Sequence, residues 1–236
     1  MSARGGAGDA AQRMDQMYRW QRYIYDLTRK YYLVGRDQMI RELALSPGER
    51  VLEIGCGTAR NLVLMAKRYP NAMFYGIDAS EEMLRSARAL VRSHGLDHRI
   101  KLAQGLAGTG DGLRVFGDDR AYDRVVISYA LSMFDDPTMA LEDATAMVRP
   151  GGALHIVDFA QMDGMPGLAA KGLRAWLALF DVTPRAEVRR WLETQATSEA
   201  GRLETKDLMG GYAELLRYDK LAALTNAATA VAEERA

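Results

Sequence analysis

The sequence predicts an α/β protein in which helices cover both faces of a mostly parallel β-sheet. Short apolar runs typical of buried strands alternate with helical segments between residues 50 and 160. After residue 160, the runs RLETKDLMG and GYAELLRY meet at a pair of glycines and predict an antiparallel strand pair that closes the sheet. These observations together predict seven strands, of which only the last pair runs antiparallel.

The expected elements follow one another in order along the chain. Strands are expected at about residues 50–54, 72–78, 100–105, 122–130, 153–160, 202–210 and 211–218, and helices at about 58–69, 80–94, 137–148, 167–180 and 184–199. Residues 105–120 are expected to form a loop. Pro150-Gly151-Gly152 predicts a break before the fifth strand.

Segments of different composition flank this core. Residues 1–10 are small and polar, and we expect them to be disordered. Residues 11–45 predict a helical cap with many aromatic side chains, and residues 160–200 predict a helical lid inserted into the domain. Residues 218–236 are rich in alanine and predict a C-terminal helix, so the domain is expected to span residues 11–217.

Length, charge and composition limit the classes of function. The 236 residues fit one α/β domain with additions, and a net charge of zero gives no electrostatic reason to expect a nucleic-acid partner. The single cysteine, Cys56, excludes an internal disulfide and fits a reducing compartment. Because His94, His98 and His155 lack the spacing of metal ligands, no metal is expected. With neither a signal-peptide pattern nor an apolar run of membrane-span length, the expected location is cytoplasmic.

The stretch VLEIGCGTARNL, residues 51–62, predicts a ligand-binding turn. An apolar strand leads into Gly55-Cys56-Gly57, and a helix begins directly afterwards. This order brings bare backbone amides and a helix N-terminus against a ligand. Asp78 ends the next strand, where an acid commonly holds ribose hydroxyls in nucleotide-binding folds.

Two ligand classes fit this turn, a nicotinamide dinucleotide and S-adenosylmethionine. Arg60 stands where the dinucleotide fingerprint has its third glycine, and the carboxylate of Glu53 would repel a pyrophosphate. S-adenosylmethionine carries a sulfonium and an ammonium, which an acid beside the loop suits. The turn therefore favours S-adenosylmethionine.

Five pieces of the sequence stand in the order found in class I S-adenosylmethionine-dependent methyltransferases. They are VLEIGCGTA, FYGIDAS, IKLAQGLA, YDRVVISYALS and VRPGGALHIVDF, and the chain resembles that family over about residues 25–160. The resemblance implies a Rossmann-like sheet, S-adenosylmethionine as methyl donor and S-adenosylhomocysteine as product.

The resemblance also implies a set of residues around the cofactor. Glu53 is expected to order the glycine loop, and Asp78 to take the ribose. Leu106 stands where the family often has an acid or asparagine, so adenine is expected to contact the backbone of Gly105–Ala107. The full set is Tyr25, Tyr32, Arg36, Glu53, Gly55, Cys56, Gly57, Asn61, Asp78, Ala79, Met83, Gly105, Leu106, Ala107, Ser128 and Tyr129.

A narrower resemblance bears on the methyl acceptor. The stretches YRWQRYIYDLTRKYYLVGRDQMIREL, GCGTARNL, SYALSM and WLALFDVTPR together look like the bacterial betaine-lipid N-methyltransferases, through about residue 212. This implies a lipid-linked amine as substrate, with diacylglyceryl-homoserine converted to its N-trimethyl form. A soluble small molecule or a quinone precursor is the alternative acceptor, because the cofactor motifs are shared. A non-catalytic cofactor-binding domain is a further alternative, and the oligomeric state is left open.

Methyl transfer to an amine needs a proton acceptor, because an ammonium has no free electron pair. Tyr129, Asp158 or a water could take the proton, and the sequence does not choose among them. The family resemblance adds Tyr25, as part of a Tyr25-Asp26 pair that closes over the cofactor. Aromatic faces suit the methylated cation, and the candidates for that lining are Tyr18, Tyr25, Tyr32 and Tyr129.

Basic side chains alternate with aromatic ones near the N-terminus, which is typical of a helix at an anionic interface. The basic residues are Arg13, Arg19, Arg22, Arg29, Lys30 and Arg36. Residues 168–180 form a second apolar stretch, with Leu173, Trp176, Leu177 and Phe180. Peripheral contact with the inner face of an anionic membrane is one expectation, and packing of both segments on the domain is the alternative.

Overall fold

The computed structural model describes residues 33–117, 120–134, 136–178, 182–198 and 201–222. Internal contacts divide the chain into two units, residues 1–34 and 35–236. Only Leu33 and Val34 of the first unit are described. The expected disordered start and the aromatic part of the cap, including the candidate tyrosines at 18, 25 and 32, therefore lie outside the described residues.

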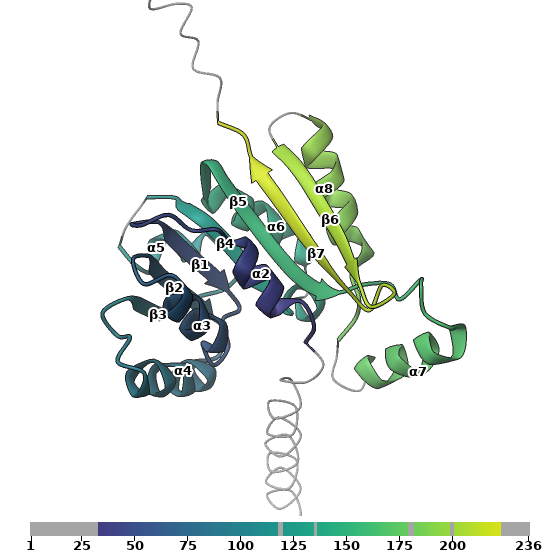
Figure 1. Cartoon of the computed structure of the whole chain (residues 1–236), viewed down its shortest axis with the longest axis horizontal. Helices are drawn as coiled ribbons and strands as arrows, with labels where there is room; N and C mark the ends of the chain where they lie inside the picture. The colour runs from purple at the N-terminus through teal and green to yellow at the C-terminus, as the bar shows by residue number, and fades with distance from the viewer. Residues whose placement is uncertain (1–32, 118–119, 135, 179–181, 199–200, 223–236) are drawn as a thin grey trace, which may run out of the picture. The chain divides into compact units, whose positions relative to one another are not determined.

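A seven-stranded sheet forms the centre of the second unit (Figure 1), in the order β3-β2-β1-β4-β5-β7-β6. The strands are β1 (Arg50–Ile54), β2 (Met73–Asp78), β3 (Ile100–Gln104), β4 (Tyr122–Ser128), β5 (Val148–Phe159), β6 (Gly201–Leu208) and β7 (Ala213–Lys220). Strands β1 to β5 pair in parallel, whereas β7 runs antiparallel to both β5 and β6. The predicted fold class is confirmed.

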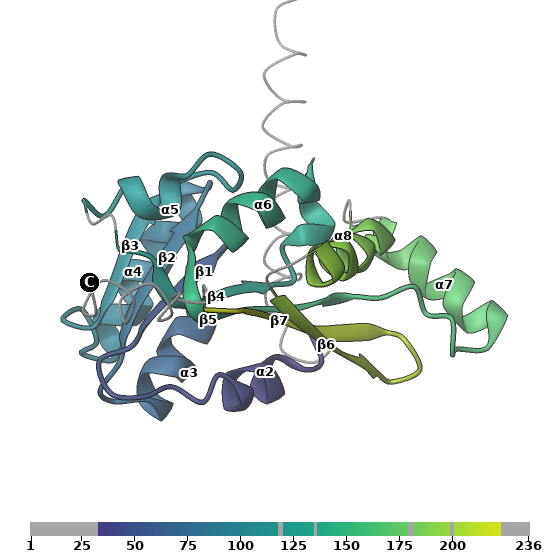
Figure 2. The same ribbon diagram turned by 90° about the horizontal axis from the view of Figure 1, so that it is seen from above.

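Helices cover both faces of this sheet, as the view from above in Figure 2 shows. One face carries α2 (Arg36–Glu42), α3 (Arg60–Arg68) and α4 (Glu81–Ser93), and the other carries α5 (Asp111–Arg114), α6 (Pro137–Met147) and α8 (Ala186–Ser198). Helix α7 (Gly167–Ala178) lies beyond the carboxyl end of β5 instead of covering the sheet (Figure 1). Within the described ranges, no helix combines the length and the apolar character needed to cross a membrane.

Local sequence explains where several of these helices begin. The Ser80 hydroxyl accepts a hydrogen bond from the Met83 N–H at 3.3 Å and so caps α4. The Asp136 carboxylate caps α6 through two N–H groups, and Pro137 follows in the first turn, where its missing N–H costs nothing. These caps fix the helix starts that the sequence predicts near residues 80 and 137.

The centre of the sheet is its most deeply buried part. Every residue of β1 is buried, and so are the last four of β4. Strand β1 pairs with β2 on one side and with β4 on the other. The chain therefore adds β2 and β3 on one side of β1 and later strands on the other, so the strand order reverses between β1 and β4. In open α/β sheets, ligands bind at the carboxyl ends of the strands beside such a reversal.

Three boundaries differ from those expected from the sequence. Strand β5 begins at Val148, so Pro150-Gly151-Gly152 lies within it, at a register shift against β4. The expected loop at 105–120 contains the short helix α5. Residues 218–220, expected to start the C-terminal helix, belong to β7 because they pair with β6, and residues 223–236 lie outside the described residues.

Candidate cofactor and acceptor site

The glycine loop follows β1 directly. Gly55 and Gly57 both have left-handed backbone, with φ of 71° and 53°. A Cβ atom on Gly55 would lie 2.8 Å from the Cβ of Ala130, whereas a Cβ on Gly57 would meet nothing within 4 Å. The N–H groups of Gly55 and Cys56 both donate to the Ile77 carbonyl, at 2.9 and 3.0 Å. The loop is thus packed against β2 on one side and open at Gly57.

Two buried side chains, those of Glu53 and Cys56, hold this loop in place. Glu53 is 1% exposed, and its carboxylate accepts a hydrogen bond from the Asn61 amide at 2.7 Å, which joins β1 to the first turn of α3. Cys56 is also buried, and its sulfur packs against Gly76 of β2. Burial, followed by the charges of Glu53 and Asp78, raises the pKa of the Cys56 thiol, which stays protonated and unsuited to a nucleophile.

Asp78 at the end of β2 joins the glycine loop to the next helix. One of its carboxylate oxygens accepts the Gly57 N–H at 2.8 Å, and the other accepts the Ser80 N–H at 2.9 Å. The side chain is half-buried, so the carboxylate has one side toward the open part of the loop. Ala79 and Met83, the residues expected at the adenine slot, follow immediately, and the Ala79 carbonyl accepts from Gln104 of β3 at 2.9 Å.

The loop after β3 uses some of its backbone donors within the protein. The N–H of Gly105 donates to the Asp78 carbonyl at 3.2 Å, and the N–H of Leu106 donates to the Asp111 carboxylate at 3.0 Å. Two of the backbone donors expected for adenine at Gly105–Ala107 are therefore engaged within the protein. Asp111 adds a carboxylate to this loop. The hydrogen bond from the Leu106 N–H lowers the pKa of Asp111, so the carboxylate is ionised. Sequence reasoning missed Asp111 because it follows Leu106 by several residues.

Tyr129 and Asp158 lie at the ends of β4 and β5. Tyr129 is 2% exposed and takes left-handed backbone with φ of 53°. Burial is the largest cause that raises its pKa, so its hydroxyl stays protonated at neutral pH, and its role as a proton acceptor stays a prediction. The Asp158 carboxylate accepts the N–H groups of Ser132 at 3.1 Å and Phe159 at 2.8 Å. This ties the short helix η1 (Leu131–Met133) to β5.

Buried aromatic and polar side chains surround Tyr129 at the carboxyl ends of β4 and β5. The Phe159 ring lies edge-on between Tyr129 and Tyr212, with ring centroids 4.8 and 5.6 Å apart. Arg36 of α2 is 8% exposed and close enough for its charge to act on the Tyr129 hydroxyl. Ser128 is buried, and its hydroxyl has no hydrogen-bond partner among the described residues. Of the expected site residues, those from α2, β1, β2 and β4 thus gather around the carboxyl ends of the strands.

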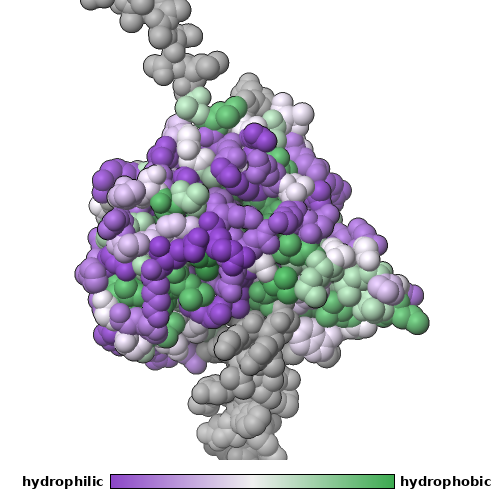
Figure 3. Space-filling view, in the orientation of Figure 1, coloured by the Kyte–Doolittle hydropathy of each residue, from purple (hydrophilic) through white to green (hydrophobic). Residues whose placement is uncertain are grey.

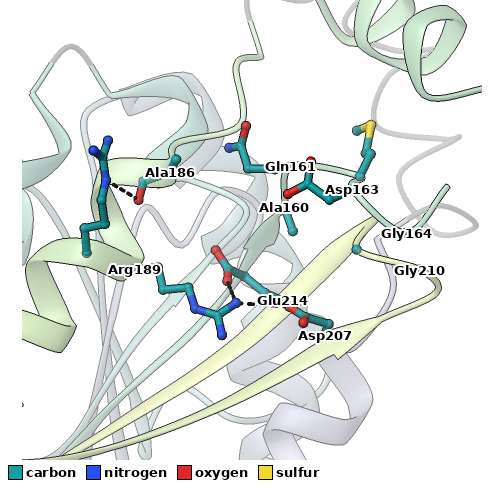
Figure 4. Close-up of a pocket in the computed structure, with 12 residues that line it drawn as sticks. Ala160, Gln161, Asp163, Gly164, Ala186, Arg189, Asp207, Gly210 and Glu214 are labelled. Atoms are coloured by element: carbon teal, nitrogen blue, oxygen red, sulfur yellow. Dashed lines mark hydrogen bonds and ion pairs between the residues drawn. The ribbon is translucent and has the colours of Figure 1, made fainter. Parts of the chain in front are cut away.

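A cavity of about 430 Å³ lies beside the carboxyl end of β5, between α8 and the β6–β7 hairpin (Figure 4). Its charged lining residues are Asp163, Arg189, Arg190, Asp207 and Glu214. Glu214 is 7% exposed, and its carboxylate points toward Arg189, from which it is 3.6 Å away (Figure 4). Sequence reasoning gave no role to these residues, because the hairpin register that brings them together is not visible in the sequence.

Comparison with known proteins finds methyltransferases. Residues 51–152 match the family model described as "Methyltransferase domain". The "Demethylmenaquinone methyltransferase" of Geobacillus stearothermophilus is 27% identical over 182 residues, which cover 75% of each chain. The protein of that name from Corynebacterium glutamicum strain R is 31% identical over 140 residues, 57% of this chain and 54% of the relative.

The fold is also similar to that of solved methyltransferases. A structure described as a SAM dependent methyltransferase from Aquifex aeolicus matches with a TM-score of 0.61 and 20% identity, over 82% of this chain and 93% of that chain. The strand–glycine–helix turn with Asp78 beside it, the matched domain and the fold define the class. The protein is an S-adenosylmethionine-dependent methyltransferase.

The donor set fits the methyl donor that this class uses. The open backbone at Gly57 and the carboxylates of Glu53 and Asp78 suit a ligand with a methionine ammonium and ribose hydroxyls. S-adenosylmethionine, when bound, supplies an electrophilic methyl group, and this chain's residues hold it and the acceptor. The role of each residue in that binding stays a prediction.

Proposed function

We propose that this methyltransferase acts on a quinone precursor. The observation that carries the proposal is the similarity to the two demethylmenaquinone methyltransferases described above, of which the match to the Geobacillus stearothermophilus protein covers three quarters of both chains. This acceptor was the alternative to the lipid-linked amine that the narrower sequence resemblance implies. The relatives favour the quinone precursor over that amine.

A specific observation keeps the lipid-linked amine as a second candidate. The cavity beside β5 has three acids and two arginines among its lining residues, and one of the acids, Glu214 of β7, is buried. A net negative lining attracts an ammonium group, whereas it offers a neutral ring no electrostatic gain. An amine-bearing headgroup such as that of diacylglyceryl-homoserine therefore fits this lining.

For either acceptor, the protein's main contribution is position. Methyl transfer from a sulfonium is an in-line displacement, and holding the two reactants in attack geometry is worth roughly 7–11 kcal/mol. Packing at the carboxyl ends of β4 and β5 supports such positioning, because the Tyr129, Phe159 and Tyr212 rings lock against one another. No metal is needed for this reaction.

We further propose peripheral contact with an anionic membrane. The surface over α7 is largely apolar (Figure 3), and Leu168 on that helix is 89% exposed. Lys171 and Arg174 are exposed on the same helix, which carries no acid. An exposed apolar helix with basic residues suits an anionic lipid surface, and an acceptor held in lipid would be reached from there.

One assay distinguishes the acceptors. Purified protein is incubated with methyl-labelled S-adenosylmethionine and, separately, with demethylmenaquinone in its reduced form, diacylglyceryl-homoserine micelles and a water-soluble amine, and products are identified by mass spectrometry. The proposal expects label in the quinone product. Label only in the homoserine lipid would replace it with the second candidate, and label in none of the three would overturn both.

A further inference from the structure

Three acids form a row across the far side of the sheet. In the strand register, Glu214 of β7 stands opposite Asp158 of β5 and also opposite Asp207 of β6. Residues paired in this way carry their side chains on the same face of a sheet. The row therefore runs from the Tyr129–Asp158 region at the centre to the cavity under α8.

The positive charge available to this row is small. Arg189 of α8 lies 3.6 Å from Glu214, and its guanidinium is shared with Asp207 and Glu193, each at 3.3 Å. Its contact with Glu214 is longer than a hydrogen bond. Among the described residues, Glu214 is thus a buried carboxylate on a cavity wall that one shared guanidinium only partly compensates (Figure 4).

The surroundings set the proton affinity of Glu214. Burial raises its pKa to about 7, Arg189 opposes that rise, and the charges of Asp207, Asp158 and Glu193 add to it. Arg190 and Asp163 are the other charged groups on the cavity wall. A carboxylate that titrates near neutral pH is able both to take a proton from a substrate and to release it to water.

The reaction needs such a group. When an acceptor gains a methyl group, it loses one proton overall, and the carbon–sulfur bond breaks with its electrons kept by sulfur. In an amine, the N–H bond breaks and its electron pair attacks the methyl carbon. In reduced demethylmenaquinone, the O–H bond breaks, a ring carbon of the resulting anion attacks the methyl carbon, and the proton on that ring carbon then leaves and restores the hydroxyl. Tyr129 stays protonated, and Asp158 is held by the backbone N–H groups of Ser132 and Phe159. Burial raises the pKa of Asp158 as well, but Asp158 does not line the cavity under α8, whereas Glu214 does.

We propose that Glu214 accepts the acceptor's proton and that the cavity under α8 receives the acceptor's reacting group. The proposal deepens the proposed function and holds for a quinol hydroxyl as well as for an amine. Glu214 takes the proton onto its carboxylate and returns it to solvent through the cavity mouth, where the exposed Asp207 lies. One protonation cycle accompanies each methyl group transferred.

The test uses Glu214→Gln, which keeps the shape but cannot accept a proton. We expect turnover of the acceptor identified by the labelling assay to fall at least 100-fold, since general-base catalysis contributes about 10²–10⁴. Binding of S-adenosylhomocysteine, measured by calorimetry, should be unchanged. Glu204→Gln, an exposed acid on β6 outside the cavity under α8, is the matched control and should keep full turnover.

The pH profile supplies a readout that a purely structural role would not move. A base must be deprotonated, so the parent's kcat should rise with pH, with the midpoint of the rise at about 7. Arg189→Met should shift this rise to higher pH, because the group that lowers the pKa is lost. Asp207→Asn should shift it to lower pH, because a repelling charge is lost. If Glu214→Gln does not fold, Glu214→Asp together with these opposite shifts decides the matter.

The possible failures are distinguishable. A parent enzyme that methylates none of the three acceptors overturns the proposed function and this assignment together. A folded Glu214→Gln variant that keeps more than a tenth of the parent's rate overturns this assignment alone. If neither Arg189→Met nor Asp207→Asn shifts the pH profile of kcat, the assignment of Glu214 as the base is also overturned.

Discussion

The two ends of the sheet differ in how their sites are assembled. The cofactor end is made of short turns, in which Glu53, Gly55, Gly57 and Asp78 lie within or just after two neighbouring strands. The Gly57 N–H donates to Asp78 directly, and Glu53 and Gly55 bond to residues close by in the same strands and helix. The far end, beyond β5, gathers Arg189 from α8 and Glu214 from β7 across an insertion and a hairpin. At the first end, the residues predicted to bind the cofactor therefore belong to short local sequence motifs. The proposed acceptor site, at the second end, depends on long-range packing.

The largest expected effect tests the cofactor end. Asp78→Ala would lose two charge-assisted contacts to the ribose, each worth roughly 1.5–3 kcal/mol, so affinity for S-adenosylhomocysteine should fall about 10²–10⁴-fold. Calorimetry measures this, and nicotinamide dinucleotides should show no binding to the parent. Asp97→Ala, an exposed acid between α4 and β3, is the control. Parent-like affinity in Asp78→Ala would remove the ribose assignment.

A second prediction compares the stability cost of adding a side chain at Gly55, which is packed in the glycine loop, with the cost at Gly48, which has open space around it. Gly55→Ala should cost about 2–5 kcal/mol of stability, because left-handed backbone is strained for alanine and the new Cβ would clash with Ala130. Gly48→Ala shares the positive φ, at 84°, but has open space around it, so it should cost only the backbone strain of about 1–2 kcal/mol. Urea unfolding measures both. Equal losses would show that the contact with Ala130 is unimportant.

The far end is tested by membrane contact. Parent protein should float with anionic vesicles at low salt, and high salt should weaken binding, because each basic residue near such a surface contributes about 1 kcal/mol that salt screens. Leu168→Glu on α7 should reduce flotation several-fold. Met139→Glu, at an exposed apolar residue of α6, is the control and should not reduce flotation. Parent protein that stays unbound on anionic vesicles at low salt would end the membrane proposal.

The smallest effect is expected at Cys56. Its thiol is buried and protonated, so Cys56→Ala should cost about 1 kcal/mol of stability from lost packing while methyl transfer stays within a factor of two. Thermal unfolding and the labelling assay measure the two quantities. Loss of turnover without loss of stability would point to chemistry at the sulfur.

What the sequence by itself determined is the fold class, the enzyme class and the cofactor. The fold class follows from the alternation of short strands and helices. The cofactor follows from the glycine turn within residues 51–62 and the acid at the end of the next strand, and the enzyme class from the resemblance of five sequence pieces to the methyltransferase family. The tertiary structure decided what depends on register and on distant contacts. Asp111 reaches the Leu106 N–H, Asp158 is held by η1, and Glu214 stands between Asp158 and Asp207. A one-residue slip of β7 would turn Glu214 to the opposite face, and no periodicity in the sequence specifies that register.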